Sequence, residues 1–143
     1  MPNWTYPVTI NAKDGDLAVS VRDLPEVVTS GDTREQALEF AADAIEVAVA
    51  VRMERDQELP EPSRVRKGEH PVSLPAQLAA KASVYAAWKK AKITKVEFAR
   101  RLGRNEVEVR RILNPRYGTK LDQLEEAARA LGGRLVVEFQ TAA

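Results

Sequence analysis

The residues best suited to direct chemistry lie between Thr94 and Leu113, where basic and amide side chains recur at helical spacing. At about 100° per residue, the outer face of a helix that follows Asn105 would carry Val107, Arg110, Arg111 and Asn114. Arginine donors fit the acceptors of guanine, an asparagine amide fits adenine, and a small apolar group fits the methyl of thymine. This face is therefore predicted to read base edges in a DNA major groove.

Other basic and amide residues flank this face. Four of them lie on the preceding helix or in loops, positions that suit phosphate contacts better than base contacts: Lys95, Arg100, Arg116 and Lys120. Arg104 and Asn105, in the turn itself, complete the candidate DNA-binding set. Asn105 also has a purely structural interpretation, because Asn105 and Glu108 have the spacing of a helix-capping pair.

Two short amphipathic helices must position these side chains. The first begins at Thr94, whose spacing to Glu97 fits a capping box, and its inner face would carry Phe98, Ala99 and Leu102. Gly103 supplies the permissive backbone that a tight turn needs. The second helix would bury Val109, Ile112 and Leu113. The pattern favours a helix-turn-helix, although two amphipathic helices around a glycine can also be a plain αα-hairpin.

Charge is unevenly distributed along the 143 residues, although the formal net charge is only +1. Residues 1–74 carry 8 basic and 14 acidic side chains, whereas residues 75–143 carry 14 basic and 7 acidic ones. An acidic front half joined to a basic rear half suggests two different partners, with a polyanion bound by the basic half.

Several kinds of site are not expected from the sequence. There is no cysteine for disulfides or thiolate ligands, and His70, the one histidine, lies in a turn-like stretch. No glycine-rich phosphate loop is present, so no cofactor or metal ion is expected. The most apolar segment, residues 37–51, is too short and too acidic to span a membrane, and no signal peptide pattern begins the chain. We therefore expect a soluble, cytoplasmic protein.

The front half predicts a small antiparallel sheet. Strands are expected at residues 4–10, 17–21 and 27–29, with the first two joined by the turn signal Asp14-Gly15. Pro7 argues that the first strand lies at an edge or contains a bulge. After a proline-rich connection, residues 72–74 can return as the last strand.

A capping box at Thr33 and Gln36 opens the helix of the front half. Its inner stripe would consist of Ala37, Leu38, Ala41, Ala44, Ile45, Ala48 and Val49. Phe40, Val47 and Val51 fall outside this stripe, and they either form a second contact surface or are ordinary scattered surface groups. One helix on a small antiparallel sheet, a ββαβ-type layer of the α+β class, is the simplest way to bury the stripe.

The rear half predicts helices and one last strand. A helix from Pro75 to about residue 91 would place Leu78, Ala82, Tyr85 and Trp88 on one side. A further helix, capped by Thr119, would bury Leu121, Leu124, Ala128 and Leu131. Residues 134–139 alternate as a strand does, and this strand must join the front sheet or pair with a second copy of the chain. Pairing with a copy is favoured, because helix-turn-helix proteins usually read two half-sites as dimers.

Taken together, these motifs resemble the HicB antitoxins of bacterial type II toxin–antitoxin systems. The front-half signature is Tyr6-Pro7, Asp14-Gly15, Asp23-Leu24-Pro25, Thr29-x-Gly31-Asp32-Thr33 and Leu59-Pro60-x-Pro62-Ser63. The rear-half signature is Val72-x-Leu74-Pro75, the run from Glu97 to Gly103, Thr119-Lys120-Leu121-Asp122 and Ala130-Leu131-Gly132. The glycine that usually follows the Asp-Leu-Pro motif is replaced by Glu26 in this chain.

The resemblance implies a degenerate RNase H-like domain over residues 1–70 that binds a small, basic, RNA-cleaving toxin of the HicA type, which has a catalytic histidine. It also implies a helix-turn-helix domain over residues 71–143 that binds and represses the operator of the toxin–antitoxin genes, in an oligomer. Tyr6, Asp16, Asp23 and Glu26 are the expected toxin contacts.

Two alternatives follow from the same residues. An RNase H-like fold raises the possibility of two-metal nuclease chemistry, which needs converging carboxylates. Asp14 and Asp16 lie in a turn and the helix acids face outward, so no enzymatic activity is expected. The other alternative is a helix-turn-helix regulator whose front domain senses a ligand or another protein and has no toxin partner.

Overall fold

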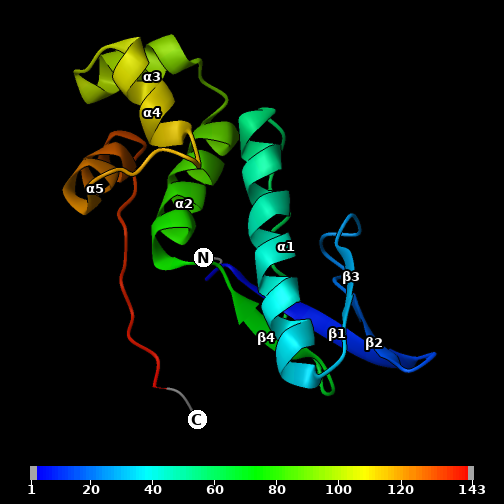
Figure 1. Ribbon diagram of the computed structural model, residues 1–143. Helices are drawn as coiled ribbons and strands as arrows, with labels where there is room; N and C mark the ends of the chain where they lie inside the picture. Colours follow the sequence, from blue (N-terminus) through cyan, green and yellow to red (C-terminus); the bar gives the residue numbers. More distant parts are fainter. Residues whose placement is uncertain (1–2, 142–143) are drawn as a thin grey trace. The chain divides into compact units, whose positions relative to one another are not determined.

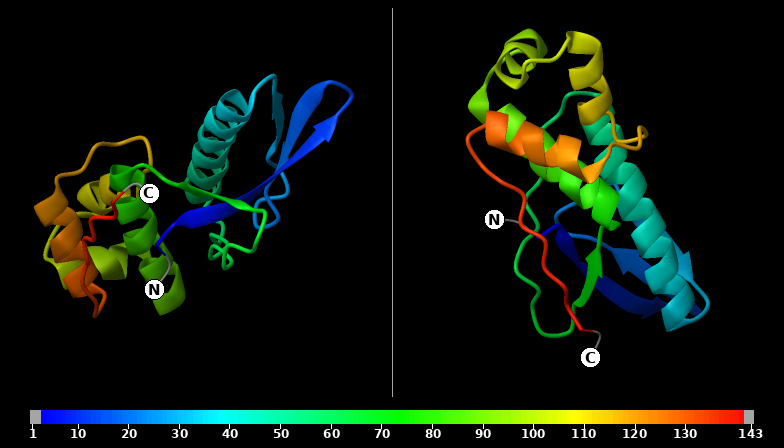
Figure 2. Two further views of the ribbon diagram at one scale, coloured as in Figure 1. Left: turned by 90° about the horizontal axis from the view of Figure 1, so that it is seen from below. Right: turned by 90° about the vertical axis from the view of Figure 1, so that its left-hand side faces the viewer.

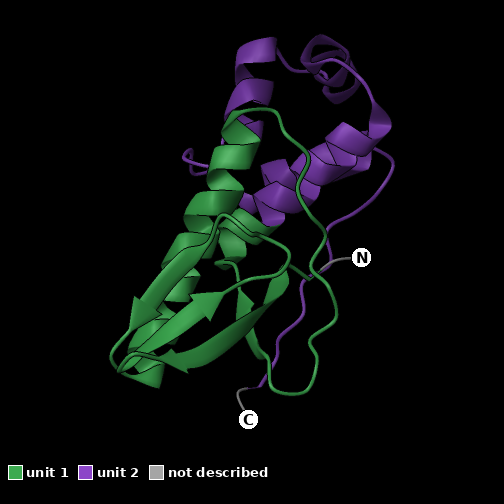
Figure 3. Cartoon of the chain, turned by 90° about the vertical axis from the view of Figure 1, so that its right-hand side faces the viewer, with its two compact units in different colours: residues 1–79 green, residues 80–143 purple. Residues whose placement is uncertain are grey.

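The computed structural model describes residues 3–141 and separates into two compact units, residues 1–79 and 80–143 (Figure 3). The protein is of the predicted α+β class, with a small antiparallel sheet followed by helices. Helix α2, Ala76–Ala91, begins in the first unit and continues into the second. The boundary between the units falls later than the expected one after residue 70, because residues 70–73 form a strand of the sheet.

The first unit is a four-stranded antiparallel sheet with one long helix on it (Figure 1). The strands are β1 (Thr5–Lys13), β2 (Asp16–Ser20), β3 (Val28–Gly31) and β4 (His70–Ser73), in the order β3-β2-β1-β4. Helix α1, Arg34–Glu54, lies across one face of this sheet, as two further views confirm (Figure 2). The predicted layer and its last strand are thus confirmed.

Strand β1 lies inside the sheet as a whole, yet Pro7 itself has the edge position that the sequence predicts. The first half of β1, from Thr5 to Val8, pairs with β4, and the second half, from Thr9 to Lys13, pairs with β2. Pro7 therefore lies where β1 has a partner strand on only one side. A proline is tolerated there because the missing N–H costs no ladder hydrogen bond on the open side.

The core of the first unit joins the sheet to the inner stripe of α1. Thr33 caps this helix, its Oγ1 accepting a hydrogen bond from the Gln36 amide at 3.1 Å. Five residues of the predicted stripe are buried, namely Ala37, Ala41, Ile45, Ala48 and Val49. Leu38 and Ala44 are half-buried. Periodicity therefore identified the buried face of this helix correctly.

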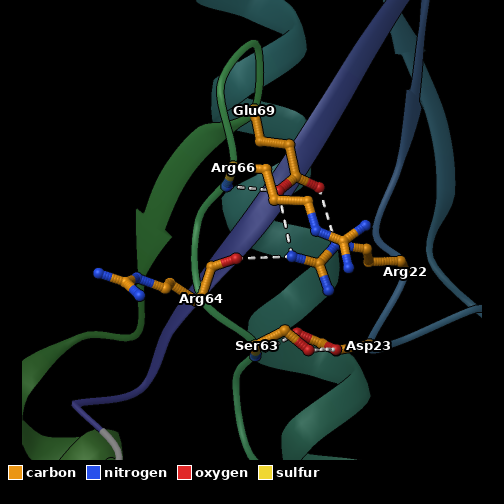
Figure 4. Close-up of polar contacts among 6 residues, drawn as sticks. All are labelled: Arg22, Asp23, Ser63, Arg64, Arg66 and Glu69. Carbon is orange, nitrogen blue, oxygen red and sulfur yellow. Dashed lines mark hydrogen bonds and ion pairs between the residues drawn. The ribbon is translucent and has the colours of Figure 1, made fainter.

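The connection between α1 and β4 is held against the corner that follows β2 (Figure 4). The Arg22 guanidinium donates to both carboxylate oxygens of Glu69, at 2.8 and 3.1 Å, and to the Arg64 carbonyl at 2.7 Å. The Asp23 carboxylate accepts hydrogen bonds from the backbone amide and the hydroxyl of Ser63, at 2.7 and 2.5 Å. These contacts fix a proline-rich segment that has no regular secondary structure of its own.

Replacing Glu69 by glutamine should release this connection. The Glu69 pKa is lowered to about 2, first by the Arg22 hydrogen bonds and then by the Arg66 amide. Its contribution to stability is thus present above about pH 4.5 and lost as the pH falls towards 2. At neutral pH we expect faster trypsin cleavage after Arg64, Arg66 and Lys67 in E69Q, followed by mass spectrometry. E58Q, an exposed change in the same connection, should be cleaved like the wild type, and equal cleavage of E69Q would contradict the assignment.

The second unit is helical. After α2 come α3 (Lys95–Leu102), α4 (Glu106–Leu113) and α5 (Leu121–Ala130). Residues 134–139 form no strand within the described chain, and the sheet does not include them. Joining the sheet of the same chain, the first of the two arrangements expected for this segment, is therefore not observed, and pairing with a second copy stays a prediction.

A candidate nucleic-acid interface and a candidate partner surface

Helices α3 and α4 flank the three-residue turn Gly103–Asn105, as the sequence predicts. Thr94 Oγ1 accepts from the Glu97 amide at 3.0 Å and so caps α3. Gly103 ends α3 with a left-handed φ of 71°, which favours glycine. The predicted inner faces are buried at Phe98, Ala99, Val109, Ile112 and Leu113. The outer face of α4 is therefore fixed on a packed helix pair.

All four residues predicted for the outer face of α4 are exposed, namely Val107, Arg110, Arg111 and Asn114. The three polar ones each have a local neighbour. Arg110 Nη2 lies 2.7 Å from Glu106 Oε1, and the Arg111 guanidinium lies over the Tyr117 ring at 5.3 Å from its centroid. Asn114 Oδ1 accepts from the Arg116 amide at 2.9 Å. An adenine contact by Asn114 would have to share this oxygen.

The flanking candidates are of two kinds: two have contacts that stabilise the helices, and the other four lie on α3 or in the loops beside α4. Arg104 and Asn105 have structural roles: Arg104 Nη2 lies 2.9 Å from Glu126 Oε2 of α5, and Asn105 Oδ1 accepts from the Glu108 amide at 2.9 Å. The capping interpretation of Asn105 is thus confirmed. The Arg100 guanidinium is paired with Glu97, and Lys95 Nζ lies 5.7 Å from the centroid of the Trp88 ring. Arg116 and Lys120 are exposed.

The second unit contains a buried lysine that was not predicted from the sequence. Lys81 is fully buried, and its Nζ donates to the Arg111 carbonyl at 3.0 Å and to Thr119 Oγ1 at 2.6 Å. Burial lowers the pKa of Lys81 to about 8. Lys81 thereby joins α2 to the last turn of α4 and to the segment before α5.

This contact also corrects the expected cap of α5. The N-cap residue is Lys120, which makes no side-chain capping bond, because the hydroxyl of Thr119 is directed to Lys81. A signal for Lys81 exists in the sequence: it lies three residues after Leu78 and four before Tyr85, on the predicted inner stripe of α2. Its polarity excluded it from the expected core.

Two of the residues expected to contact a partner protein are structural. Tyr6 is fully buried, and its hydroxyl donates to the Pro60 carbonyl at 2.8 Å. Burial, followed by the nearby Asp23 carboxylate, raises the pKa of Tyr6. Asp23 is half-buried and accepts both hydrogen bonds from Ser63. These contacts correct the expectation for Tyr6 and leave Asp23 a mainly structural role.

The other two expected partner contacts are exposed. Asp16 begins β2 next to the Asp14-Gly15 turn. Glu26 forms a two-point ion pair with Arg52 near the end of α1, with Nε and Nη2 at 2.8 and 2.9 Å from its oxygens. The Arg52 hydrogen bonds lower the pKa of Glu26. Glu26 therefore ties the corner before β3 to the long helix.

A groove of about 520 Å³ lies between that corner, β3 and α1. Its lining residues are Glu26, Val27, Val28, Thr29, Phe40, Asp43, Ala44, Val47, Ala48 and Val51. The three apolar residues that fell outside the buried stripe of α1 are all among them. The sequence therefore indicated the helical wall of this groove, while the wall formed by β3 depends on the fold.

Residues 3–141 contain no group of three or more acidic or histidine side chains placed to hold a metal ion. Over the same range, no helix has both the length and the apolar character needed to cross a membrane.

Comparison with known proteins adds a family relationship. A family model described as HicB_like antitoxin of bacterial toxin-antitoxin system matches residues 5–83. The chain is 37% identical over 139 residues to Antitoxin HicB 1 of Photorhabdus laumondii, covering 96% of this chain and 88% of that relative. It is 37% identical over 131 residues to Antitoxin HicB of Escherichia coli K12, covering 91% and 95% respectively. Antitoxin HicB of Pseudomonas fluorescens is 28% identical over 140 residues.

Proposed function

The chain belongs to the HicB-like antitoxin family of bacterial toxin–antitoxin systems, and we propose that it neutralises a HicA-type RNA-cleaving toxin and represses its own operon. The relatives are named as antitoxins, which are regulators rather than enzymes, in agreement with the expectation that this protein has no catalytic activity. For the first unit, the degenerate RNase H-like fold stays a prediction. Both proposed partners, toxin and operator, would place this function in the cytoplasm.

The observation that supports operator binding most directly is the exposed outer face of α4. This face presents two arginines on a helix whose first turn is capped and whose inner side is packed against α3. A helix held in this way can enter a major groove without losing its own packing. The second unit is also the basic part of the chain, and a basic surface attracts the DNA backbone.

Operator binding further implies an oligomer, since two half-sites about 34 Å apart need two such helices. We propose that residues 134–139 pair with the same segment of a second copy. Val136, Val137 and Phe139 support this, because they are exposed by 78%, 81% and 91% in the single chain. Large apolar side chains that are this exposed are typical of an interaction surface.

Replacing Arg110 by alanine should weaken operator binding by about 1–3 kcal/mol, or roughly 5–150-fold, because a base or phosphate contact is lost. Fluorescence anisotropy with operator DNA at fixed salt concentration would measure the change. R129A is a matched control, because Arg129 on α5 makes the same type of pair with Glu125 and is similarly exposed, at 59% against 63%. Equal weakening by R129A would indicate a general charge effect and contradict the proposed interface.

The toxin half of the proposal is tested by co-expression. Cells that express the cognate HicA-type toxin should stop growing, and the wild-type chain should restore their growth. Restoration should also occur with R110A, because the substituted face belongs to the proposed DNA contact. If the wild-type chain fails to restore growth and the purified proteins do not bind, the antitoxin function is refuted for this chain.

A further inference from the structure

We propose that the toxin docks in the groove between β3 and α1. The toxin would insert an apolar ridge of its own, flanked by basic side chains of the toxin. This inference rests on the proposed antitoxin function and adds the surface that would perform it. Three observations carry it: the shape of the groove, the exposure of its apolar walls and the charge beside it.

The groove is open along an edge of the sheet. In the order β3-β2-β1-β4, strand β3 has a neighbouring strand on one side only. Val28, at the start of β3, is 84% exposed, and Phe40 and Val47 on α1 are 39% and 55% exposed. Val27 and Ala48 behind them are buried and connect the groove to the core. Such a contiguous apolar surface on a folded unit is typical of a site that a partner covers.

The negative charge next to the groove favours a basic partner. Asp43 lies in the lining, and Glu39 and Glu46 lie beside it on α1, with no basic residue in the lining itself. At 100° per residue these three acids form a stripe along one side of the apolar stripe of Phe40, Val47 and Val51. No ion pair within the described chain neutralises this acidic stripe. A basic polypeptide is attracted here, whereas nucleic acid is repelled.

One wall of the groove is held in place before any partner binds. The Glu26 carboxylate is fixed by both donors of Arg52, so the corner that carries Val27 and Val28 is tied to the end of α1. A preformed site loses less conformational entropy on binding than a mobile one. A second copy of this chain is a less suitable occupant, because it would bring an identical acidic stripe to the same surface.

The test uses the full-length chain and a catalytically inactive form of the toxin. V47R places a cation and a longer side chain in the groove, and we expect at least a tenfold loss of toxin affinity by isothermal titration calorimetry. D43K, an exposed change that leaves the apolar walls intact, should also weaken toxin binding at least tenfold. V65R is the matched control, because Val65 is 37% exposed in the α1–β4 connection, outside the groove. Its affinity should match that of the wild type.

The outcomes separate this inference from the proposed function. If wild-type protein binds the toxin and V47R and D43K bind equally well, the groove is not the docking site and the antitoxin function stands. If V65R loses as much affinity as V47R, the effect is one of general charge, and the docking site is refuted. If V47R changes only the oligomeric state in light scattering, the groove holds a second copy instead. If wild-type protein binds no toxin, the antitoxin function itself fails.

Discussion

Replacing Gly31 by alanine is expected to lower the free energy of unfolding of the first unit by about 3 kcal/mol, since overpacking a tight contact typically costs 1–3 kcal/mol and occasionally more. A Cβ at this position would lie 2.6 Å from the Ala37 amide nitrogen and 2.8 Å from the Ala37 Cα. It would also lie 3.0 Å from the Gln36 carbonyl carbon. These are backbone atoms of the first turns of α1, so the clash cannot be relieved by rotating a side chain.

The two tryptophans allow the two units to be measured separately. Trp4 is buried in the first unit and Trp88 in the second, so urea unfolding followed by fluorescence in a W88F background reports on the first unit. G118A, which lies in the second unit and is therefore followed by Trp88 fluorescence in a W4F background, is the control substitution, because a Cβ at Gly118 meets no atom within 4 Å. It should change the free energy of unfolding by less than about 0.5 kcal/mol. A midpoint for G31A equal to that of the wild type would show that β3 and α1 do not approach as closely as described.

Gly31 shows which part of a motif can be explained from the sequence and which part depends on the tertiary fold. The motif Thr29-x-Gly31-Asp32-Thr33 leads into the helix that Thr33 is predicted to cap, and Thr33 is indeed the cap. What makes the glycine necessary is the packing of β3 against the first turns of α1. That packing depends on the whole sheet and cannot be deduced from five residues.

The elements themselves were predictable, because caps, turns and periodicity are local. Thr33, Thr94 and Asn105 each cap the helix for which they were proposed. For Tyr6 the expectation of a partner contact is wrong for the opposite reason, whereas for the half-buried Asp23 it stays a prediction. Their hydrogen-bond partners, Pro60 and Ser63, lie 54 and 40 residues away in the chain. A polar side chain in a short motif therefore looked like a surface contact when it is part of the unit's own packing.

The same limit applies to the candidate sites. Helical periodicity correctly predicted that Arg110 and Arg111 are exposed. It could not predict that Arg104 is paired with Glu126 on another helix. Periodicity also placed Phe40, Val47 and Val51 off the buried stripe, without showing which strand would complete the groove. Which side chains face outward was thus a local question, while what they meet was set by the tertiary fold.

Lys81 leads to the second of the two largest expected effects. Its pKa is lowered to about 8 from an ordinary value of 10.5, and burial is the cause. Between these two values the unfolded chain still holds the proton that the folded chain has released. The free energy of unfolding must therefore rise with pH over this range. One pKa unit corresponds to about 1.4 kcal/mol, so we expect the second unit to gain about 3 kcal/mol between pH 8 and 10.5.

Urea unfolding at successive pH values, followed by Trp88 fluorescence in a W4F background, would measure this gain. K81M should remove the rise with pH, because methionine has no proton to release, although it also leaves the Arg111 carbonyl and the Thr119 hydroxyl without their shared donor. K90M, which replaces an exposed lysine of the same helix, should keep the wild-type rise. If K81M and the wild type respond to pH alike, Lys81 is not buried as described. A rise that is specific to Lys81 would confirm that its amine is buried, in agreement with its hydrogen bond to the Arg111 carbonyl at the end of α4.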